Sequence, residues 1–313
     1  MSLAFVIDAL VTVVGVTTPI LLAATGELVA EKSGVINLGV EGMMLIGAIA
    51  AFAVAFDFGP DLGDAAPWVA VLSAAVAGAL SSMLFAVLAL TLGSNQVATG
   101  LALTIFGIGL SSLIGAGYVG MTVPSFDSFF PDWLAGDPVG RVLFGYSPLV
   151  YFALVMVFAV GWFLNRTRGG LILRAVGEND LSAHSIGYPV IPIRYATIAF
   201  GGALAGIGGA YFSMVITPMW AEQMTAGRGW IALALVVFSG WRAGRLLAGA
   251  YFFGILMTLE PYAKASGFSF LPSQFWAAMP YIMAVVVLAV ISARGVAGSE
   301  APACLGRSFL PNS

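Results

Sequence analysis

The sequence has 313 residues, of which 60% are hydrophobic and 9% are charged, and its formal net charge is −3. A soluble domain carries about 25% charged residues, so this composition excludes a globular enzyme with a water-facing surface. One cysteine, Cys304, one histidine, His184, and the negative net charge exclude an internal disulfide, a Cys- or His-rich metal site and a nucleic-acid-binding protein.

Long apolar runs between the charged residues predict membrane-spanning helices, each of which needs roughly 20 residues. The runs are continuous rather than alternating, which argues against a β-barrel. The predicted spans are residues 4–25, 35–56, 66–92, 96–118, 147–164, 195–216, 229–240, 246–261 and 275–293. The run 229–240 is too short for a full crossing, so we expect half of a broken or re-entrant helix there. The sequence predicts an all-α polytopic membrane protein with about 8–10 transmembrane helices, as one domain over residues 1–313.

The basic residues predict the orientation of the spans, because Lys and Arg concentrate in cytoplasmic loops. They lie mainly in residues 166–194, at Arg242 and Arg245, and at Arg294 and Arg307. All of these can face the cytoplasm if the spans alternate, which places the acidic stretches 57–64 and 127–137 outside, with only Arg141 nearby. The amino terminus is then outside as an uncleaved first span, and the carboxyl terminus is cytoplasmic.

Small residues in the sixth span predict close helix packing. Gly202 and Gly206 are four residues apart on one face of a helix, where a second helix can approach. Gly206, Gly208 and Gly209 superficially resemble a dinucleotide-binding loop. No predicted strand precedes them, so we interpret these glycines as packing residues.

Residues 26–44 place three acids, a lysine and an asparagine at the entry of an apolar span. Glu41 lies within the predicted span, where a charged residue costs ~2.5–3.5 kcal/mol on insertion scales. Such residues usually face the interior of a bundle or a water-filled path. For Glu41, a structural role is favoured over direct contact with a substrate.

Polar uncharged side chains enter the span that follows Ser94. Gln96 and Thr99 share one helix face by the i, i+3 rule, and Thr104 lies further along the same helix. For each residue alone, hydrogen bonding between helices is favoured, at ~0.6–2 kcal/mol per contact. Because several occur together, they also suit a path for a neutral solute. The predicted path residues are Asn37, Glu41, Gln96, Thr99 and Thr104.

The polar loop at residues 165–194 is the longest in the chain. A short helical stretch is expected between Leu171 and Ile186, ended by Gly187 and Pro189. A membrane anchor explains the arginines of this loop but not its acids, asparagine and small residues. A docking surface for a cytoplasmic partner explains both.

The energy source is predicted to lie outside this chain. The sequence has no G-x-x-x-x-G-K-[ST] phosphate loop and no series of acids and histidines suited to a proton relay. It also shows no catalytic nucleophile with a base and no cluster of metal ligands. We therefore expect a transport subunit with no catalytic residues, no metal and no cofactor of its own. An ion-coupled secondary transporter is the alternative.

Four separated motifs resemble one family. They are EKSGVINLGVEGMMLIGA (Glu31–Ala48), SNQVATGLALTIFGIGLSSLIG (Ser94–Gly115), LILRAVGEND from Leu171 onward, and TAGRGWIALALVVFSGW (Thr225–Trp241). They are similar to the permease subunits of bacterial ATP-binding-cassette (ABC) importers for nucleosides, which are grouped with ribose and branched-chain amino acid permeases. The resemblance extends from about Pro19 to Arg307, which is nearly the whole chain.

This resemblance implies a bacterial inner-membrane complex that imports a nucleoside-like solute by alternating access. Its partners would be a second homologous permease, usually making a heterodimer, a cytoplasmic ATPase that binds ATP and Mg, and an extracytoplasmic solute-binding protein. Ala183-x-x-x-Gly187 is similar to the core of the importer coupling loop, although Leu181 replaces its usual glutamate. The residues assigned to ATPase coupling are Arg174, Glu178, Asn179, Ala183 and Gly187. Ribose-type sugars and branched-chain amino acids are the alternative solutes.

Overall fold

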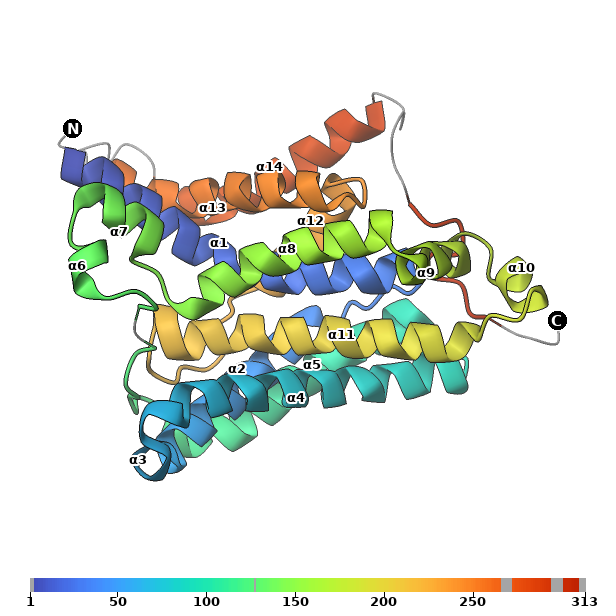
Figure 1. The fold of residues 1–313 in the computed structure, drawn as a ribbon, viewed down its shortest axis with the longest axis horizontal. Coiled ribbons are helices and arrows are strands. Elements are labelled where there is room, and N and C mark those ends of the chain that lie inside the picture. The colour runs from blue at the N-terminus through green and yellow to red at the C-terminus, as the bar shows by residue number, and fades with distance from the viewer. Residues whose placement is uncertain (1–2, 127, 266–271, 294–300, 310–313) are drawn as a thin grey trace.

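The computed structural model describes residues 3–126, 128–265, 272–293 and 301–309 (Figure 1). In these residues, seven helices are long and apolar enough to cross a membrane. They are α1 (Leu3–Lys32), α2 (Val40–Asp57), α4 (Ala66–Ala86), α5 (Gln96–Gly115), α8 (Pro148–Arg166), α11 (Val190–Tyr211) and α13 (Ala243–Ala265). The shorter α12 (Arg228–Phe238) and α14 (Ser273–Ala293) are also apolar, and π-helical turns extend α4 through Thr91 and α11 through Ile216. The prediction of an all-α polytopic membrane protein is confirmed.

The short elements gather at two opposite ends of the helix bundle (Figure 1). The acidic end holds the start of α1, together with α3 (Gly59–Leu62), η1 (Gly63–Ala65), η3 (Ala116–Tyr118), α6 (Asp132–Ala135) and α7 (Pro138–Phe144). The basic end holds α9 (Arg168–Glu178), α10 (Asp180–Ser185) and the segment 301–309. The start of α1 and the segment 301–309 thus lie at opposite ends, as the predicted spans require. Arg294 and Asp127 lie outside the described residues.

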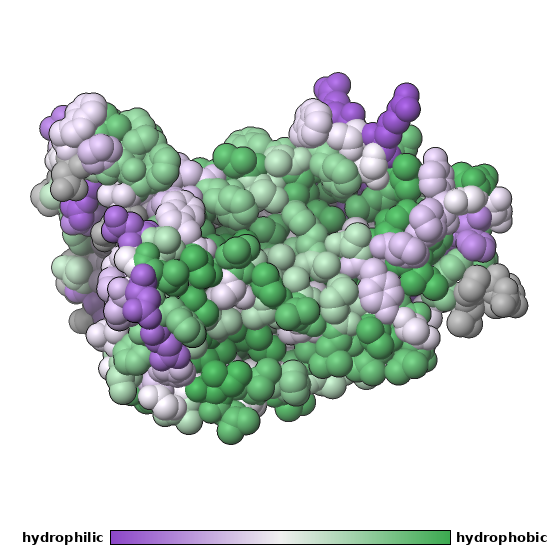
Figure 2. All heavy atoms as spheres, turned by 60° about the horizontal axis from the view of Figure 1, so that its bottom comes forward, coloured by the Kyte–Doolittle hydropathy of each residue, from purple (hydrophilic) through white to green (hydrophobic). Residues whose placement is uncertain are grey.

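Large apolar side chains cover the outside of the bundle between these ends. Figure 2 shows a broad apolar surface across the middle of one face, with the most hydrophilic residues toward its margins. Leu72 on α4 is 63% exposed and Leu113 on α5 is 76% exposed. A surface of this kind would cause association in water and is expected for helices that face lipid.

The core forms where α1, α2, α4 and α11 pack together, and glycines set the spacing. A Cβ atom added to Gly78 would collide with the carbonyl oxygen of Gly202, and one added to Gly206 would collide with that of Ala74. The backbones of α4 and α11 are therefore in direct contact at two successive turns. The predicted packing role of Gly202 and Gly206 is confirmed.

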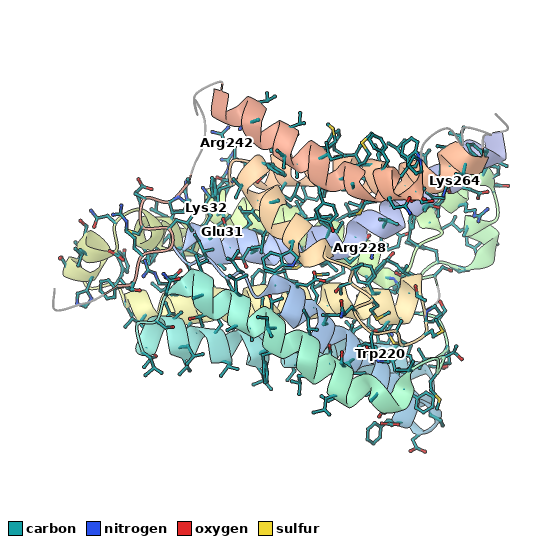
Figure 3. The ribbon with its side chains drawn as sticks, turned by 180° about the vertical axis from the view of Figure 1, so that it is seen from behind. Glu31, Lys32, Trp220, Arg228, Arg242 and Lys264 are labelled. Atoms are coloured by element: carbon teal, nitrogen blue, oxygen red, sulfur yellow. The ribbon has the colours of Figure 1, made fainter. Side chains whose placement is uncertain are left out.

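Helix α12 is too short to cross the membrane alone. Its 11 residues extend about 16 Å at 1.5 Å per residue, against about 30 Å of hydrocarbon. Residues 217–227 precede it without forming a helix. In Figure 3, α12 runs from the middle of the bundle near Arg228 toward the basic end near Arg242. The short helix expected at 229–240 is confirmed.

Helix α2 also begins inside the bundle, and here the predicted boundary was wrong. The predicted span began at residue 35, but residues 33–39 are non-helical and α2 begins at Val40. Gly42 packs against Leu103 and Gly107, which are about 10 and 16 Å along α5 from its first residue. The amino terminus of α2 therefore lies well away from the basic end.

Candidate functional site

The first candidate site is the α2–α12 junction, formed by Glu41, Thr225, Gly227, Arg228 and Gly229. The Glu41 carboxylate accepts hydrogen bonds from Thr225 Oγ1 (2.5 Å), Gly227 N (2.8 Å) and Gly229 N (2.6 Å). Free backbone N–H groups and the helix dipole favour a negative charge at the amino terminus of α12. The acid of α2 thus satisfies the amino terminus of α12, and the junction holds two helix ends together inside the bundle.

The backbone before α12 is bent to reach this carboxylate. Gln223, Ala226 and Gly227 have φ values of +53°, +47° and +80°. Residues with a Cβ seldom adopt positive φ, at a cost of order 1–3 kcal/mol each. Gly229 allows close approach, because a Cβ there would lie 2.6 Å from the Glu41 Cα. The strained turn and the glycine together permit the contact between the two helix ends.

Arg228 adds a positive charge to the junction (Figure 3). Its Nη1 donates to the carbonyl oxygens of Thr225 (3.4 Å) and Met224 (3.5 Å), and its guanidinium carbon lies 4.8 Å from the centre of the Phe212 ring. A guanidinium above an aromatic face gains a cation–π interaction, which strengthens away from water. Each charge of the junction therefore has protein partners.

Residues 33–39 connect α1 to α2, and three of the predicted path residues hold them in place. Gln96 Oε1 accepts from Ile36 N (2.9 Å), and Thr104 Oγ1 donates to Leu38 O (2.9 Å). Asn37 Oδ1 accepts from Gly39 N (2.9 Å). These bonds satisfy backbone groups of residues 33–39 that have no helical partner, which is what buried non-helical backbone requires.

The other two predicted path residues, Glu41 and Thr99, also make hydrogen bonds inside the protein. Glu41 is in the junction, and Thr99 Oγ1 donates to the carbonyl oxygen of Asn95, the residue that caps α5 (2.8 Å). The exposed fractions are at most 8% for Asn37, Glu41, Gln96, Thr99 and Thr104. In this conformation each of the five makes hydrogen bonds inside the protein. Their contact with a solute stays a prediction.

The second candidate site is the α9–α10 hairpin at the basic end. Thr167 caps α9 by accepting from Gly170 N (3.0 Å), and Asn179 caps α10 by accepting from Ser182 N (2.9 Å). Gly187 ends the hairpin with φ of +94°, which glycine adopts without strain. The short helical stretch predicted here is confirmed as two helices separated by Asn179.

Helix α10 has a buried face and an exposed apolar face. Ala183 is buried in a small cluster with Val176, Val190 and Phe309. On the other side Leu181 is 50% exposed and Ile186 is 73% exposed. Apolar side chains on a polar end of a membrane protein indicate a surface for a protein partner.

A buried ion pair anchors α10, and the sequence analysis did not find it. Arg194 is fully buried, its Nη2 lies 3.0 Å from Asp180 Oδ2, and its Nε donates to Ser33 O (3.1 Å). From the sequence, Arg194 counts only among the basic residues that can face the cytoplasm. Arg194 and Asp180 are 14 residues apart in the sequence, on either side of a turn. The only sequence signal for the pair is the position of Asp180, an acid that directly follows the helix-capping Asn179.

The segment 301–309 passes beneath the hairpin. Cys304 N donates to Gly177 O (2.9 Å) and Gly306 N donates to Gly34 O (3.0 Å). Gln96 Nε2 donates to Arg307 O (3.3 Å). The carboxyl-terminal segment therefore bonds to α9, to residues 33–39 and to α5 at once.

Arg174 and Glu178, both assigned to coupling, lie along one edge of the hairpin. Arg174 lines a cavity of about 390 Å³ with Lys32 and Arg242, two residues that also lie near each other in Figure 3. Trp241 also lines this cavity, and its Nε1 donates to Glu31 Oε2 (2.6 Å). This hydrogen bond connects α1 to the turn before α13. Glu178 is exposed. Among the described residues, no group of three His, Cys, Asp or Glu side chains could hold a metal ion.

Comparison with known proteins places these sites in a family of transport proteins. The family model of the branched-chain amino acid transport system permease component matches residues 9–291. A putative glucose ABC transporter permease protein, TsgC13 of Haloferax volcanii, is 37% identical and aligned over 91% of this chain and 92% of its own. The guanosine ABC transporter permease protein NupQ of Bacillus subtilis is 32% identical over 86% and 87%. The nucleoside ABC transporter permease protein NupC of Lactococcus lactis is 29% identical over 90% and 91%.

Proposed function

This chain belongs to the permease family of branched-chain amino acid transport systems, and we propose that it carries a nucleoside-like solute. It is the membrane-spanning permease subunit of an ABC importer. The observation that carries the proposed mechanism is the α2–α12 junction. Transporters place their substrate sites near the membrane midplane, where discontinuous helices meet. Two interrupted helices that meet inside the bundle fit this arrangement.

The chemistry of the junction supports a neutral solute. The Glu41 carboxylate already accepts three hydrogen bonds, and Arg228 is bonded to carbonyl oxygens and stacked on Phe212. A solute with a free carboxylate and a free ammonium group would find both charges of the junction engaged. Hydroxyl and amide groups of a nucleoside require only hydrogen bonds. Glucose is the second candidate, because the relative named for glucose is 37% identical.

We place the basic end in the cytoplasm, because Arg166, Arg168, Arg242 and Arg245 are exposed there and such residues concentrate on the cytoplasmic side. The α9–α10 hairpin is then the docking site of a separate ATPase, which binds ATP and Mg. The exposed face of α10 would contact that subunit, while Arg174, Glu178 and Asn179 would surround the contact. A second permease and an extracytoplasmic solute-binding protein complete the proposed importer.

Reconstitution tests the solute and the partners separately. The chain is purified from its native membrane and the co-purifying proteins are identified, with an ATPase and a second permease expected. The complex is then placed in liposomes with its binding protein, and uptake of labelled guanosine, glucose and leucine is measured with and without ATP. Guanosine uptake that needs ATP supports the proposal. Uptake of glucose alone would move the assignment to the second candidate, and uptake without any ATPase would refute the ATP-driven mechanism.

A further inference from the structure

An apolar groove opens on the outside of the bundle between α8 and α11. Both helices pack on α1, and Val29 of α1 lies at the bottom of the groove, which has a volume of about 640 Å³. In Figure 1, the second half of α1 is seen between α8 and α11. The walls are Met156, Ala159, Val160 and Phe163 on α8 and Ile193, Ala196 and Phe200 on α11, and no charged side chain lines the groove.

The groove has the depth of one lipid leaflet. At the basic end its lining consists of Gly169, Ile172 and Leu173 of α9 and of Tyr188 and Pro189. From Pro189 to Phe200 it follows α11 for 11 residues, which is about 16 Å. One leaflet contributes about half of the ~30 Å hydrocarbon core. The groove therefore begins near the membrane surface at the basic end and stops near the midplane.

Positive charge lies at the basic end of the groove. Arg168 directly precedes Gly169, which lines the groove, and Arg166 continues the α8 face that carries Ala159 and Phe163. Both arginines are exposed. Basic side chains at a membrane surface attract anionic headgroups by about 1 kcal/mol each. An amphipathic ligand with a long apolar chain and an anionic head matches this arrangement.

We propose that this groove binds an acyl chain of an anionic phospholipid, with the headgroup at Arg166 and Arg168. Ala159 and Ala196 are small and exposed, and they leave the width that the chain occupies. The bound chain would lie between Leu173 of α9 and Ile193 of α11, and so brace the two elements that flank α10. Control of ATPase coupling by the lipid follows from this position, and that consequence alone rests on the proposed function.

Lipid binding is measured on the intact complex by native mass spectrometry, with dioleoyl-phosphatidylglycerol and dioleoyl-phosphatidylcholine as probes. Ala159→Trp and Ala196→Trp fill the groove, and Ala102→Trp, on the exposed surface of α5, is the matched control. We expect each groove variant to lose one tightly held lipid per chain that the control keeps. Arg166→Gln with Arg168→Gln should weaken the preference for phosphatidylglycerol by about 30-fold, whereas Arg245→Gln should leave it unchanged.

Several outcomes would overturn the proposal. Equal lipid retention in the groove variants and in Ala102→Trp would show that the lipid binds elsewhere. Equal binding of the two probes to the wild type would remove the headgroup contact. If the second permease covers the groove, Ala159→Cys would cross-link to that subunit through a bifunctional thiol-reactive reagent, and no lipid would be held. Thermal unfolding of every variant checks that the variant is folded. Because bound lipid is detected by mass and no transport is measured, the lipid result would stand even if the proposed solute were wrong.

Discussion

Replacement of Glu41 tests whether the α2–α12 junction stabilises the fold. Glu41→Ala leaves the Thr225 hydroxyl and the N–H groups of Gly227 and Gly229 without their acceptor. Each buried donor left unpaired costs about 1–3 kcal/mol, and the lost charge at the helix amino terminus adds up to about 2 kcal/mol. Because the three bonds share one side chain, their costs do not simply add, and we expect a total loss of about 3–5 kcal/mol.

Two milder variants should rank below Glu41→Ala. Glu41→Gln keeps one acceptor oxygen but turns an NH₂ group toward a donor, so we expect about 2–3 kcal/mol. Thr225→Val removes one of the three bonds and leaves the carboxylate bonded to two N–H groups, for about 1 kcal/mol. The free energy of unfolding is measured in detergent by tryptophan fluorescence during denaturant titration. Asp64→Ala, an exposed acid at the acidic end, is the control and should change stability by less than about 0.5 kcal/mol.

The order of the four variants in free energy of unfolding tests the structural role of Glu41. If Glu41→Ala were no less stable than Asp64→Ala, the hydrogen bonds of the junction would not stabilise the folded chain. If Glu41→Gln matched the wild type in stability but abolished uptake, the negative charge of Glu41 would act in transport instead. A loss of stability that follows the number of bonds removed would support the structural role favoured from the sequence.

Three further predictions concern packing, anchoring and coupling. Gly78→Val should prevent α4 and α11 from touching and lower the yield of folded protein in the membrane, measured by size-exclusion chromatography, because overpacking costs ~1–3 kcal/mol or more. Arg194→Gln should leave Asp180 as a buried unpaired charge and lower the free energy of unfolding by about 3–5 kcal/mol. The double variant Arg194→Gln with Asp180→Asn should recover part of that loss, as measured by denaturant unfolding. If the double variant recovered nothing, the pairing would be refuted. Gly187 has a φ of +94° and open space around it, so Gly187→Val should cost about 1–3 kcal/mol of backbone strain. It should also reduce the ATP hydrolysis that is linked to transport. Unchanged coupling would remove the hairpin from the mechanism.

The helices could be predicted from the sequence because lipid imposes a simple rule on composition. A spanning segment must be apolar over nearly its whole length, so the charged residues mark where the spans end. This rule did not give the correct start of α2. Residues 33–39 are non-helical but carry apolar side chains, including Val35 and Leu38, and their backbone is satisfied by Gln96, Thr104 and Asn37. Hydropathy does not distinguish such a segment from the first turns of a helix.

The sites were predicted less completely, because their partners are distant in the sequence. The structural role favoured for Glu41 agrees with its three hydrogen bonds, but Thr225 is 184 residues away and no local pattern connects the two. Arg194 was counted only among the basic residues of the loop at 165–194, and its burial depends on Asp180 and on the carbonyl of Ser33, which are 14 and 161 residues away. Long-range pairs of this kind require the three-dimensional arrangement of the helices.

Residues 33–39 join the two candidate sites through one short piece of backbone. At the basic end, Ser33 O accepts from Arg194, which also holds Asp180 at the start of α10. Four residues later, Asn37 N donates to Glu27 Oε1 (3.1 Å), and α2 with Glu41 follows directly. A displacement of α10 would therefore pull on this non-helical segment, which can change its φ and ψ angles without breaking a helix. In that case Gln96, Asn37 and Thr104 would serve transport by guiding the segment, and the structural and functional interpretations of these polar residues would describe the same contacts.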